Sequence, residues 1–387
     1  MSSRSYWRPA GRPGTDPMPK RKYIKAERAK KLEKEMLTCT FCGFCKSVCP
    51  YFEDNQWDPS VARGKVILAY GLGRKEIPAD ESVIERLSQC TTCKDCERRC
   101  PSNIKVVDIV EAARADLVEA GCTLPAYKKI IDNIRATKNP YGEVKQTEFG
   151  APIREAEIGY FVGCTGRYRL PEVANHSISI LKKLNVDFTL VPEVCCGSTL
   201  QRIGAKDKDF TRLMKLNVEA AKKLKVKKLL FTCAGCYRMF KEQYPKYVDL
   251  GFEPEHMIQF LAKQKLNLKP FPRRIVYHDP CHLGRHMKVY DEPRKVLGMI
   301  PEAKLVEFAE SKDSARCCGG GGGVRASDPP AAQRIASRRV KSASEIADII
   351  VTSCPFCVSN LRFGNDLLKA DVEIKDIVEL IDDLMVT

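Results

Sequence analysis

Residues 39–50 read CTFCGFCKSVCP, and this stretch decides the first half of the fold. Its cysteines have the spacing Cys39-x2-Cys42-x2-Cys45-x3-Cys49, followed by Pro50. Residues 90–101 read CTTCKDCERRCP and repeat that spacing 51 residues later. A spacing that occurs twice with the same trailing proline indicates a duplicated binding unit, because packing alone does not require it.

The repeated spacing is that of bacterial ferredoxins, in which closely spaced thiolates hold three corners of a [4Fe-4S] cubane and the fourth cysteine binds the other cluster. By that rule one cubane is bound by Cys39, Cys42, Cys45 and Cys100, and the other by Cys90, Cys93, Cys96 and Cys49. A pair of tetrahedral zinc sites is the alternative for thiolate ligands. The triple-plus-proline spacing, present twice, favours the cubanes.

The sequence around the two runs is helical, with apolar residues three and four apart in 82–87 and 106–119. We therefore expect an α-helical ferredoxin domain over 31–135. Residues 1–30 are basic and rich in proline and glycine, which predicts a disordered tail that is either simply solvated or docks on an acidic partner or an anionic membrane. Residues 136–156 have the composition of a linker.

Strand-like and helical segments alternate after the linker, in the same order twice. The expected strands are 158–162, 188–191 and 228–232, then 274–277, 305–308 and 348–352. The expected helices are 173–184 and 206–223, then 292–299 and 331–344. Alternation of this kind predicts parallel sheets built from βαβ units. The fold class is thus multidomain α and α/β, with two duplicated Rossmann-like lobes over 157–265 and 266–387.

Each lobe carries five cysteines placed after its expected strands. The sets are Cys164, Cys195, Cys196, Cys233 and Cys236, and Cys281, Cys317, Cys318, Cys354 and Cys357. Zinc takes four ligands and a cubane has four corners, so five thiols exceed both. Each lobe has either one spare thiol beside a cubane or zinc ion, or an iron–sulfur cluster of unusual shape.

Glycines follow both cysteine pairs and would let the backbone approach a cluster closely. Gly197, Gly319 and Gly320 are the candidates for this role. The run Gly319–Gly323 is not a dinucleotide fingerprint because Val324 occupies the position of the last glycine. We expect no flavin or nicotinamide in this chain, and therefore an electron donor that is another protein.

Two ferredoxin runs followed by two such lobes resemble the cysteine-rich (CCG) family of heterodisulfide reductases, and in particular the D subunit, over residues 30–387. The resemblance implies a noncubane [4Fe-4S] cluster on the five cysteines of each lobe. It implies that the disulfide of coenzyme M and coenzyme B is cleaved between these clusters, each sulfur binding one iron. Cys195, Cys196, Cys317 and Cys318 would then be catalytic as well as metal ligands. The resemblance also implies electron delivery through the two cubanes from a partner protein, a b-type cytochrome or a flavoprotein.

The same architecture resembles the electron-relay iron–sulfur subunits of glycolate and lactate dehydrogenases. Relatives of that kind can lack part of one cysteine set, whereas this chain keeps both sets of five. The complete sets favour disulfide reduction, with the relay as the alternative. Other disulfide or thiol partners in respiratory complexes stay open.

Disulfide reduction consumes two protons, and His282, directly after Cys281, is the candidate donor. It could instead orient its loop. We expect His278 to be structural and His286 to lie at the surface, and His176 and His256 have no motif around them. Five arginines near the cysteines would bind anionic substrate groups or balance cluster charge: Arg167, Arg169, Arg202, Arg285 and Arg325. Cys122 belongs to no set and is expected to be a buried small residue.

The composition limits partners and location. The 387 residues carry 65 basic and 49 acidic side chains, a formal charge of +16 that anionic clusters would offset. No basic stretch is interleaved with aromatic residues, so we expect no nucleic-acid partner. No apolar run approaches the ~20 residues of a membrane span, so any membrane contact would go through a partner protein. Eighteen of the nineteen cysteines lie in clusters, which predicts a reducing cytoplasm. The resemblance implies a position on the cytoplasmic face of a membrane, reached through a partner subunit.

Overall fold

The computed structural model describes residues 22–205 and 207–386. The basic tail that we expected over residues 1–30 therefore lies mostly outside the described residues. Its last part does not behave as a tail, because Ile24, Ala26 and Ala29 are buried in the core of the helical domain. The apolar side chains at these three positions extend the domain to before residue 31.

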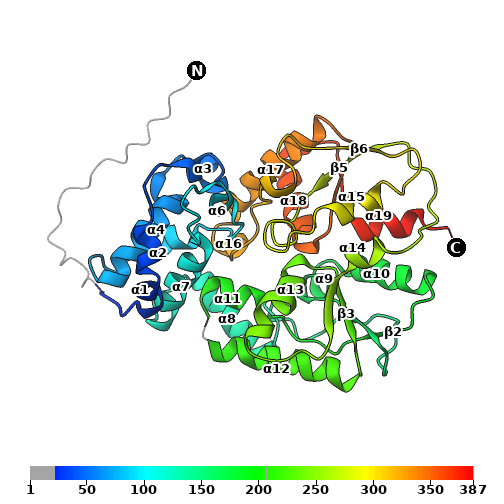
Figure 1. Ribbon diagram of the computed structural model, residues 1–387, viewed down its shortest axis with the longest axis horizontal. Helices are drawn as coiled ribbons and strands as arrows, with labels where there is room; N and C mark the ends of the chain where they lie inside the picture. Colours follow the sequence, from blue (N-terminus) through cyan, green and yellow to red (C-terminus); the bar gives the residue numbers. More distant parts are fainter. Residues whose placement is uncertain (1–21, 206, 387) are drawn as a thin grey trace.

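The N-terminal domain is a set of short helices around a central one, α7 (Figure 1). Helix α7 (Val106–Glu119) buries one apolar face, and α1 and α4 pack against it. The helices and short turns of the domain are α1 (Glu27–Lys31), α2 (Glu33–Leu37), η1 (Phe44–Lys46), α3 (Pro50–Asn55), η2 (Asp58–Ser60), α4 (Ala62–Arg74), α5 (Glu81–Ser88), α6 (Asp95–Arg99) and α7.

Helix α8 (Pro125–Thr137) joins this domain to the first lobe. It buries Tyr127, Ile131 and Ile134 in a cluster with residues of the first lobe such as Leu200. Pro125 supplies the first residue of the helix, where a missing N–H costs nothing. The segment expected as a linker then runs along the first lobe, where the Pro152 carbonyl accepts a hydrogen bond from the Leu190 N–H.

The first lobe is a four-stranded parallel sheet in the order β2-β1-β3-β4. Its strands are β1 (Ile158–Phe161), β2 (Phe188–Leu190), β3 (Lys228–Phe231) and β4 (Glu253–His256). Its helices are α9 (Cys164–Tyr168), α10 (Pro171–Lys183), α11 (Ser198–Ile203), α12 (Asp207–Lys223), α13 (Ala234–Arg238), the π-helix η3 (Met239–Gln243), η4 (Tyr244–Lys246) and α14 (Met257–Leu261).

The second lobe repeats this sheet as β6-β5-β7-β8, again parallel. Its strands are β5 (Arg274–His278), β6 (Lys304–Val306), β7 (Ile349–Thr352) and β8 (Glu373–Asp376). Its helices are α15 (Asp291–Leu297), η5 (Lys312–Ser314), α16 (Val324–Ser327), α17 (Pro329–Ser344), α18 (Pro355–Leu368) and α19 (Ile377–Leu384). The expected fold class, helical domain followed by two duplicated α/β lobes, is confirmed.

Each lobe has a fourth strand that the sequence pattern did not predict. Strands β4 and β8 lie at sheet edges and contain charged residues and, in β4, Pro254. Edge strands need only one hydrogen-bonded neighbour, and proline is tolerated there, so the apolar pattern that identifies central strands is weak.

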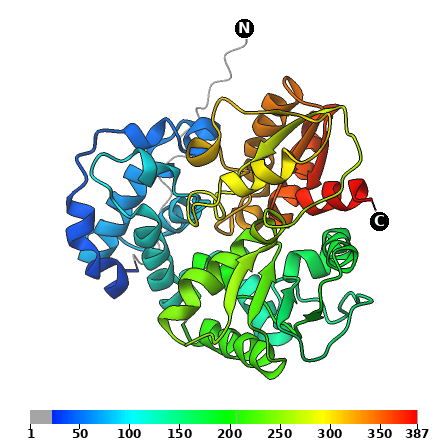
Figure 2. The ribbon, with the colours of Figure 1, turned by 45° about the vertical axis from the view of Figure 1, so that its right-hand side comes forward.

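The two lobes and the helical domain pack into one body (Figures 1 and 2). Helix α10 of the first lobe lies against α19 of the second, and α14 lies against α15. One hydrophobic core extends across both lobes. The helical domain contacts both, through α7 against α11 and through α3 against α17.

Candidate metal centres

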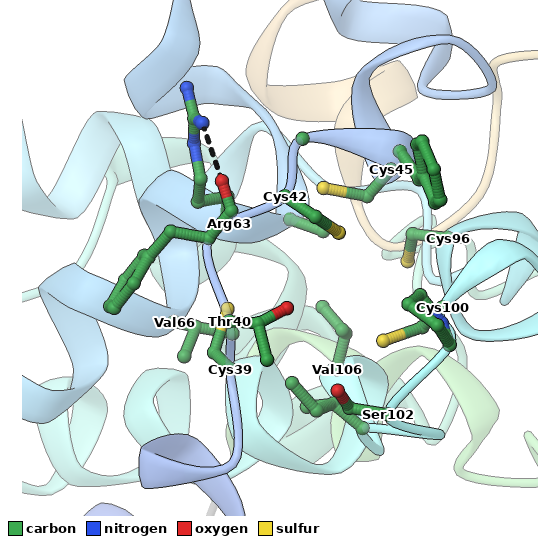
Figure 3. Close-up of a pocket in the computed structure, with 16 residues that line it drawn as sticks. Cys39, Thr40, Cys42, Cys45, Arg63, Val66, Cys96, Cys100, Ser102 and Val106 are labelled. Carbon is green, nitrogen blue, oxygen red and sulfur yellow. Dashed lines mark hydrogen bonds between the residues drawn. The ribbon is translucent and has the colours of Figure 1, made fainter.

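The first cysteine run surrounds a partly open hollow (Figure 3). Cys39, Cys42 and Cys45 line it together with Cys100, and Cys96 lies at its border. Gly43 has φ +80°, a conformation that favours glycine, and it turns the chain so that the cysteines on either side face the same space. Cys100 thus lies with the first run, although it belongs to the second in sequence.

The second run surrounds a neighbouring hollow. Cys90, Cys93 and Cys96 line it together with Cys49 from the first run. Pro50 begins α3 directly after Cys49, so the proline turns the chain away from the hollow. The two hollows share Cys96, which puts the two sites side by side.

Lys65 lines the second hollow, and its surroundings indicate whether that hollow suits an anionic cluster. Its side chain is buried, and burial lowers its pKa while the nearby Cys49 and Cys90 raise it. Its ammonium group donates to the carbonyl of Ser60. A buried ammonium facing thiolates fits a site that holds a negatively charged group, since an isolated buried cation would be costly.

The five cysteines of the first lobe form a continuous series of side-chain hydrogen bonds. Cys164 begins α9 just after β1, Cys195 and Cys196 follow β2, and Cys233 and Cys236 follow β3. Because the strands are parallel, their carboxyl ends meet at one edge of the sheet. The series runs from Cys164 to Cys195, Cys196, Cys236 and Cys233.

The second lobe repeats that series with its own five cysteines. Cys281, Cys317, Cys318, Cys357 and Cys354 are linked in the same order. In both lobes the pKa of the second cysteine of the adjacent pair is lowered. Hydrogen bonds from Cys195 and Cys236 lower it for Cys196, and hydrogen bonds from Cys317 and Cys357 lower it for Cys318. All nineteen cysteines are free.

The five-cysteine sets of the two lobes contact each other, and the set of the second lobe also contacts a ferredoxin cysteine. Cys233 of the first lobe hydrogen-bonds to Cys354 of the second. Cys317 hydrogen-bonds to Cys93, a residue of the second ferredoxin hollow, and the two are buried in one cluster with Cys281. The thiols therefore form a path from the helical domain through the second lobe to the first.

The candidate glycines differ in their positions. The N–H of Gly197 donates to Cys195 Sγ at 3.5 Å, and that of Gly319 donates to Cys317 Sγ at 3.3 Å. Both glycines have positive φ. Gly320 instead packs against Asn360, and a Cβ at Gly320 would lie 2.9 Å from the Asn360 side chain.

His282 is buried where the two lobes meet. Its Nδ1 lies 3.1 Å from Arg202 Nη2, and its ring stacks on His286 with centroids 4.1 Å apart. Burial first, and then the positive charge of Arg202, hold the pKa of His282 well below its usual range. His286, which we expected at the surface, is half-buried, because its Nε2 faces the Thr92 carbonyl at 2.9 Å.

His278, at the end of β5, was expected to be structural, but it lies at the cysteines of the second lobe. Its ring lies with Cys318 and Cys357, their ligand atoms within 4.8 Å of one another. The signal that could have found it is its position three residues before Cys281, at the carboxyl end of a central strand.

Three of the five candidate arginines lie near lobe cysteines: Arg202, Arg285 and Arg167, which lines one hollow with Cys164 and Cys195. Arg285 donates to the Cys93 carbonyl at 2.7 Å, and its guanidinium is buried near Cys281 and Cys317. Arg202 lies near Cys196 and Cys281. Arg167 also pairs with Glu193. The other two have different partners: Arg169 pairs with Glu143, and Arg325 lies over Phe363. Cys122 is buried in the helical core.

Comparison with known proteins agrees with this arrangement. Residues 158–241 and 275–362 match the family described as "Cysteine-rich domain", and residues 35–104 match "4Fe-4S dicluster domain". The chain is 37% identical over 384 residues to the D subunit of the dihydromethanophenazine:CoB–CoM heterodisulfide reductase of Methanosarcina barkeri, with 90% of this chain and 93% of that protein covered. The chain belongs to the family of heterodisulfide reductase D subunits. It is therefore an iron–sulfur oxidoreductase subunit that carries [4Fe-4S] clusters.

Other similarities widen the family. The chain is 32% identical to the B subunit of the CoM/CoB fumarate reductase of Methanothermobacter marburgensis, over 90% of this chain and 72% of that protein. A hypothetical protein from Helicobacter pylori has a similar crystal structure, with TM-score 0.58, 11% identity, and 92% of this chain and 72% of that chain covered. That likeness concerns the fold. Among the described residues, no helix is both long and apolar enough to cross a bilayer.

Proposed function

We propose that the chain reduces a small-molecule heterodisulfide, of the coenzyme M–coenzyme B type, by two electrons at paired noncubane [4Fe-4S] clusters. The observation that carries this proposal is the contact between the two five-cysteine sets at Cys233 and Cys354. A site for splitting one sulfur–sulfur bond needs two centres that face each other. The two equivalent sets, joined at one point, supply that arrangement.

The proposed electron route follows the thiol contacts. Cys39, Cys42, Cys45 and Cys100 would hold the cubane at which electrons enter, and Cys49, Cys90, Cys93 and Cys96 would hold the second. The contact of Cys93 with Cys317 would connect the second cubane to the second lobe. When bound, the cubanes would supply one-electron transfer and the noncubane centres would supply iron sites for the two substrate sulfurs.

The reaction takes one disulfide, two electrons and two protons and gives two thiols. The residues of this chain hold the centres and balance their charge, with Arg202 and Arg285 placed against the lobe cysteines. His282 is the proposed proton-transfer residue, and among the described residues its buried Nε2 has no hydrogen-bond partner. Because its lowered pKa leaves the ring neutral, it would have to take up a proton before it delivers one to a product sulfur. Its Nδ1 contact with Arg202 would fix the ring in place.

The proposed partner is an electron-donor protein, either a b-type cytochrome in the membrane or a flavoprotein. The M. barkeri and M. marburgensis relatives are both named as subunits, which supports a complex of several chains. With a membrane partner, this chain would sit on the cytoplasmic face.

Iron analysis and turnover test the proposal together. The chain, reconstituted without oxygen, should hold about sixteen iron atoms, four for each of four centres. It should also reduce the coenzyme M–coenzyme B disulfide with reduced methyl viologen as donor. An iron content near eight would leave the lobes without clusters. Full iron without disulfide reduction would favour the electron-relay function beside a glycolate or lactate dehydrogenase.

A further inference from the structure

The first ferredoxin run presents an exposed aromatic surface beside a cluster ligand. Cys42 is the one exposed cysteine among the nineteen. Phe41 and Phe44 flank it and are each 55% exposed, and Trp57 and Ile67 nearby are 56% and 48% exposed. Phe41 and Ile67 also line one open hollow with Arg63. We call Phe41, Phe44, Trp57 and Ile67 the entry surface.

The internal repeat relates the entry surface to a second, equivalent segment of the chain. The shift of 51 residues maps Phe41 onto Thr92, Cys42 onto Cys93 and Phe44 onto Asp95. The backbone agrees, since Phe41 and Thr92 both have φ +54°. The chain thus builds the same local shape twice, once exposed and once buried.

The buried copy is an interface across which the proposed electrons leave the helical domain. The Thr92 carbonyl faces His286 at 2.9 Å, and the Cys93 carbonyl accepts from Arg285 at 2.7 Å. Asp95 lies 3.8 Å from the Arg285 guanidinium. All three of these positions therefore contact the second lobe.

The exposed copy lies at the start of the proposed electron route, as the buried copy lies where electrons leave the helical domain. It carries the apolar side chains of Phe41 and Phe44 in place of Thr92 and Asp95. Three cations surround it. Arg63 donates to the Phe41 carbonyl at 3.1 Å and Arg99 lies over the Phe44 ring at 5.9 Å, while Lys46 shares Asp58 with Arg63. These side chains give the edge of the entry surface a positive charge, because its one carboxylate, Asp58, pairs with both Lys46 and Arg63. A complementary face is acidic around an apolar centre.

We propose that the entry surface docks the protein that delivers electrons, through an acidic face with an apolar centre. This inference rests on the proposed electron route, which makes the first run the entry point. It adds the docking residues and the chemistry of the partner's face. An exposed ligand such as Cys42 lets the donor's cofactor approach the first cubane with little protein between them.

The test uses the holoprotein and the double variant Phe41→Asn/Phe44→Ser. Asparagine tolerates the positive φ of position 41, so the backbone is preserved. The matched control is Leu367→Ser, since Leu367 on α18 is 56% exposed. The probe is a small acidic two-[4Fe-4S] ferredoxin. Its dissociation constant is measured by fluorescence anisotropy at several salt concentrations, and its reduction of the first cubane by electron paramagnetic resonance.

The wild type and the control should bind the ferredoxin with an affinity that falls with salt. The double variant should bind it at least about tenfold more weakly, as expected for loss of two aromatic anchors. Equal binding by the double variant and wild type would overturn the proposal. The proposal would also be overturned if the double variant lost binding to phosphatidylglycerol vesicles but bound the ferredoxin as the wild type does. That result would mean that the entry surface faces a membrane.

Reduced methyl viologen separates this inference from the proposed function. It is too small to need a docking surface, so a double variant with the iron content of the wild type should retain disulfide reduction with this donor. A lower iron content would overturn the proposal, because Phe41 and Phe44, which also line the first hollow, would then serve to hold the cluster. If the ferredoxin binds and reduces the wild type in the expected way but neither donor supports disulfide reduction, docking stands and the proposed function fails.

Discussion

The guanidinium of Arg114 donates a 2.8 Å hydrogen bond to the carbonyl of Gly322, a residue 208 positions further along the chain. The same group donates to the Arg202 carbonyl at 2.8 Å. Its remaining hydrogen bonds reach the carbonyls of Leu87, Ser88 and Cys90. One fully buried side chain on α7 thus ties the helical domain to both lobes, next to Cys90, a proposed ligand of the second cubane.

Replacing Arg114 with methionine should weaken the association of all three domains. The variant keeps much of the side-chain volume but leaves five buried carbonyl contacts without their donor. We expect the free energy of the first unfolding transition to fall by about 3 kcal/mol or more, as for removal of a buried charged partner. Urea unfolding under nitrogen measures it. Arg135→Met on α8 is the control, since Arg135 is exposed and pairs with Asp209 at the surface. Equal losses in both variants would refute a special role for Arg114.

Gly322 should tolerate no side chain, for a steric reason. A Cβ at Gly322 would lie 2.0 Å from the Cys90 carbonyl oxygen, so Gly322→Ala must push the second lobe away from the helical domain. Gly121→Ala is a matched control, because Gly121 also has positive φ but has no atom within 4 Å of its added Cβ. Both variants carry the backbone strain. Gly322→Ala alone should slow electron transfer from the cubanes to the lobes, measured by freeze-quench electron paramagnetic resonance.

Cys318→Ser should abolish disulfide reduction while leaving the cubane signals intact. Cys318 lies in the second-lobe series, and the eight ferredoxin cysteines keep their own two hollows. We expect a loss of about four iron atoms, one cluster's worth. Cys122→Ser should keep full iron and activity, since Cys122 is buried in the helical core and lines neither ferredoxin hollow. Loss of the cubane signals in Cys318→Ser would mean that the lobes and the helical domain do not assemble independently.

The sequence predicted what depends on local spacing and periodicity. The runs at Cys39 and Cys90 have a spacing that defines ligand geometry by itself, and the central strands are short apolar segments. The contact of Cys93 with Cys317 could not be predicted, because it depends on how separately folded parts dock. The burial of Lys65 could not be predicted for the same reason. His278 lies three residues before Cys281, but the cysteines it meets, Cys318 and Cys357, come from distant parts of the sequence, so its position also depends on the fold.

The association of the lobes should weaken as pH rises from about 6 to 8. His176 on α10 lies 2.8 Å from Asp382 on α19, and this hydrogen bond, opposed by burial, raises the pKa of His176 above its ordinary value. A raised folded-state pKa means that the stabilisation is complete below the unfolded-state pKa near 6.5 and is lost as pH rises through the folded value. The effect should be up to about 1 kcal/mol, since the pair is partly exposed and Asp382 also keeps Lys183. Hydrogen exchange of α19 at several pH values measures it. His176→Gln should remove this pH dependence, and an unchanged slope in that variant would refute its assignment to His176.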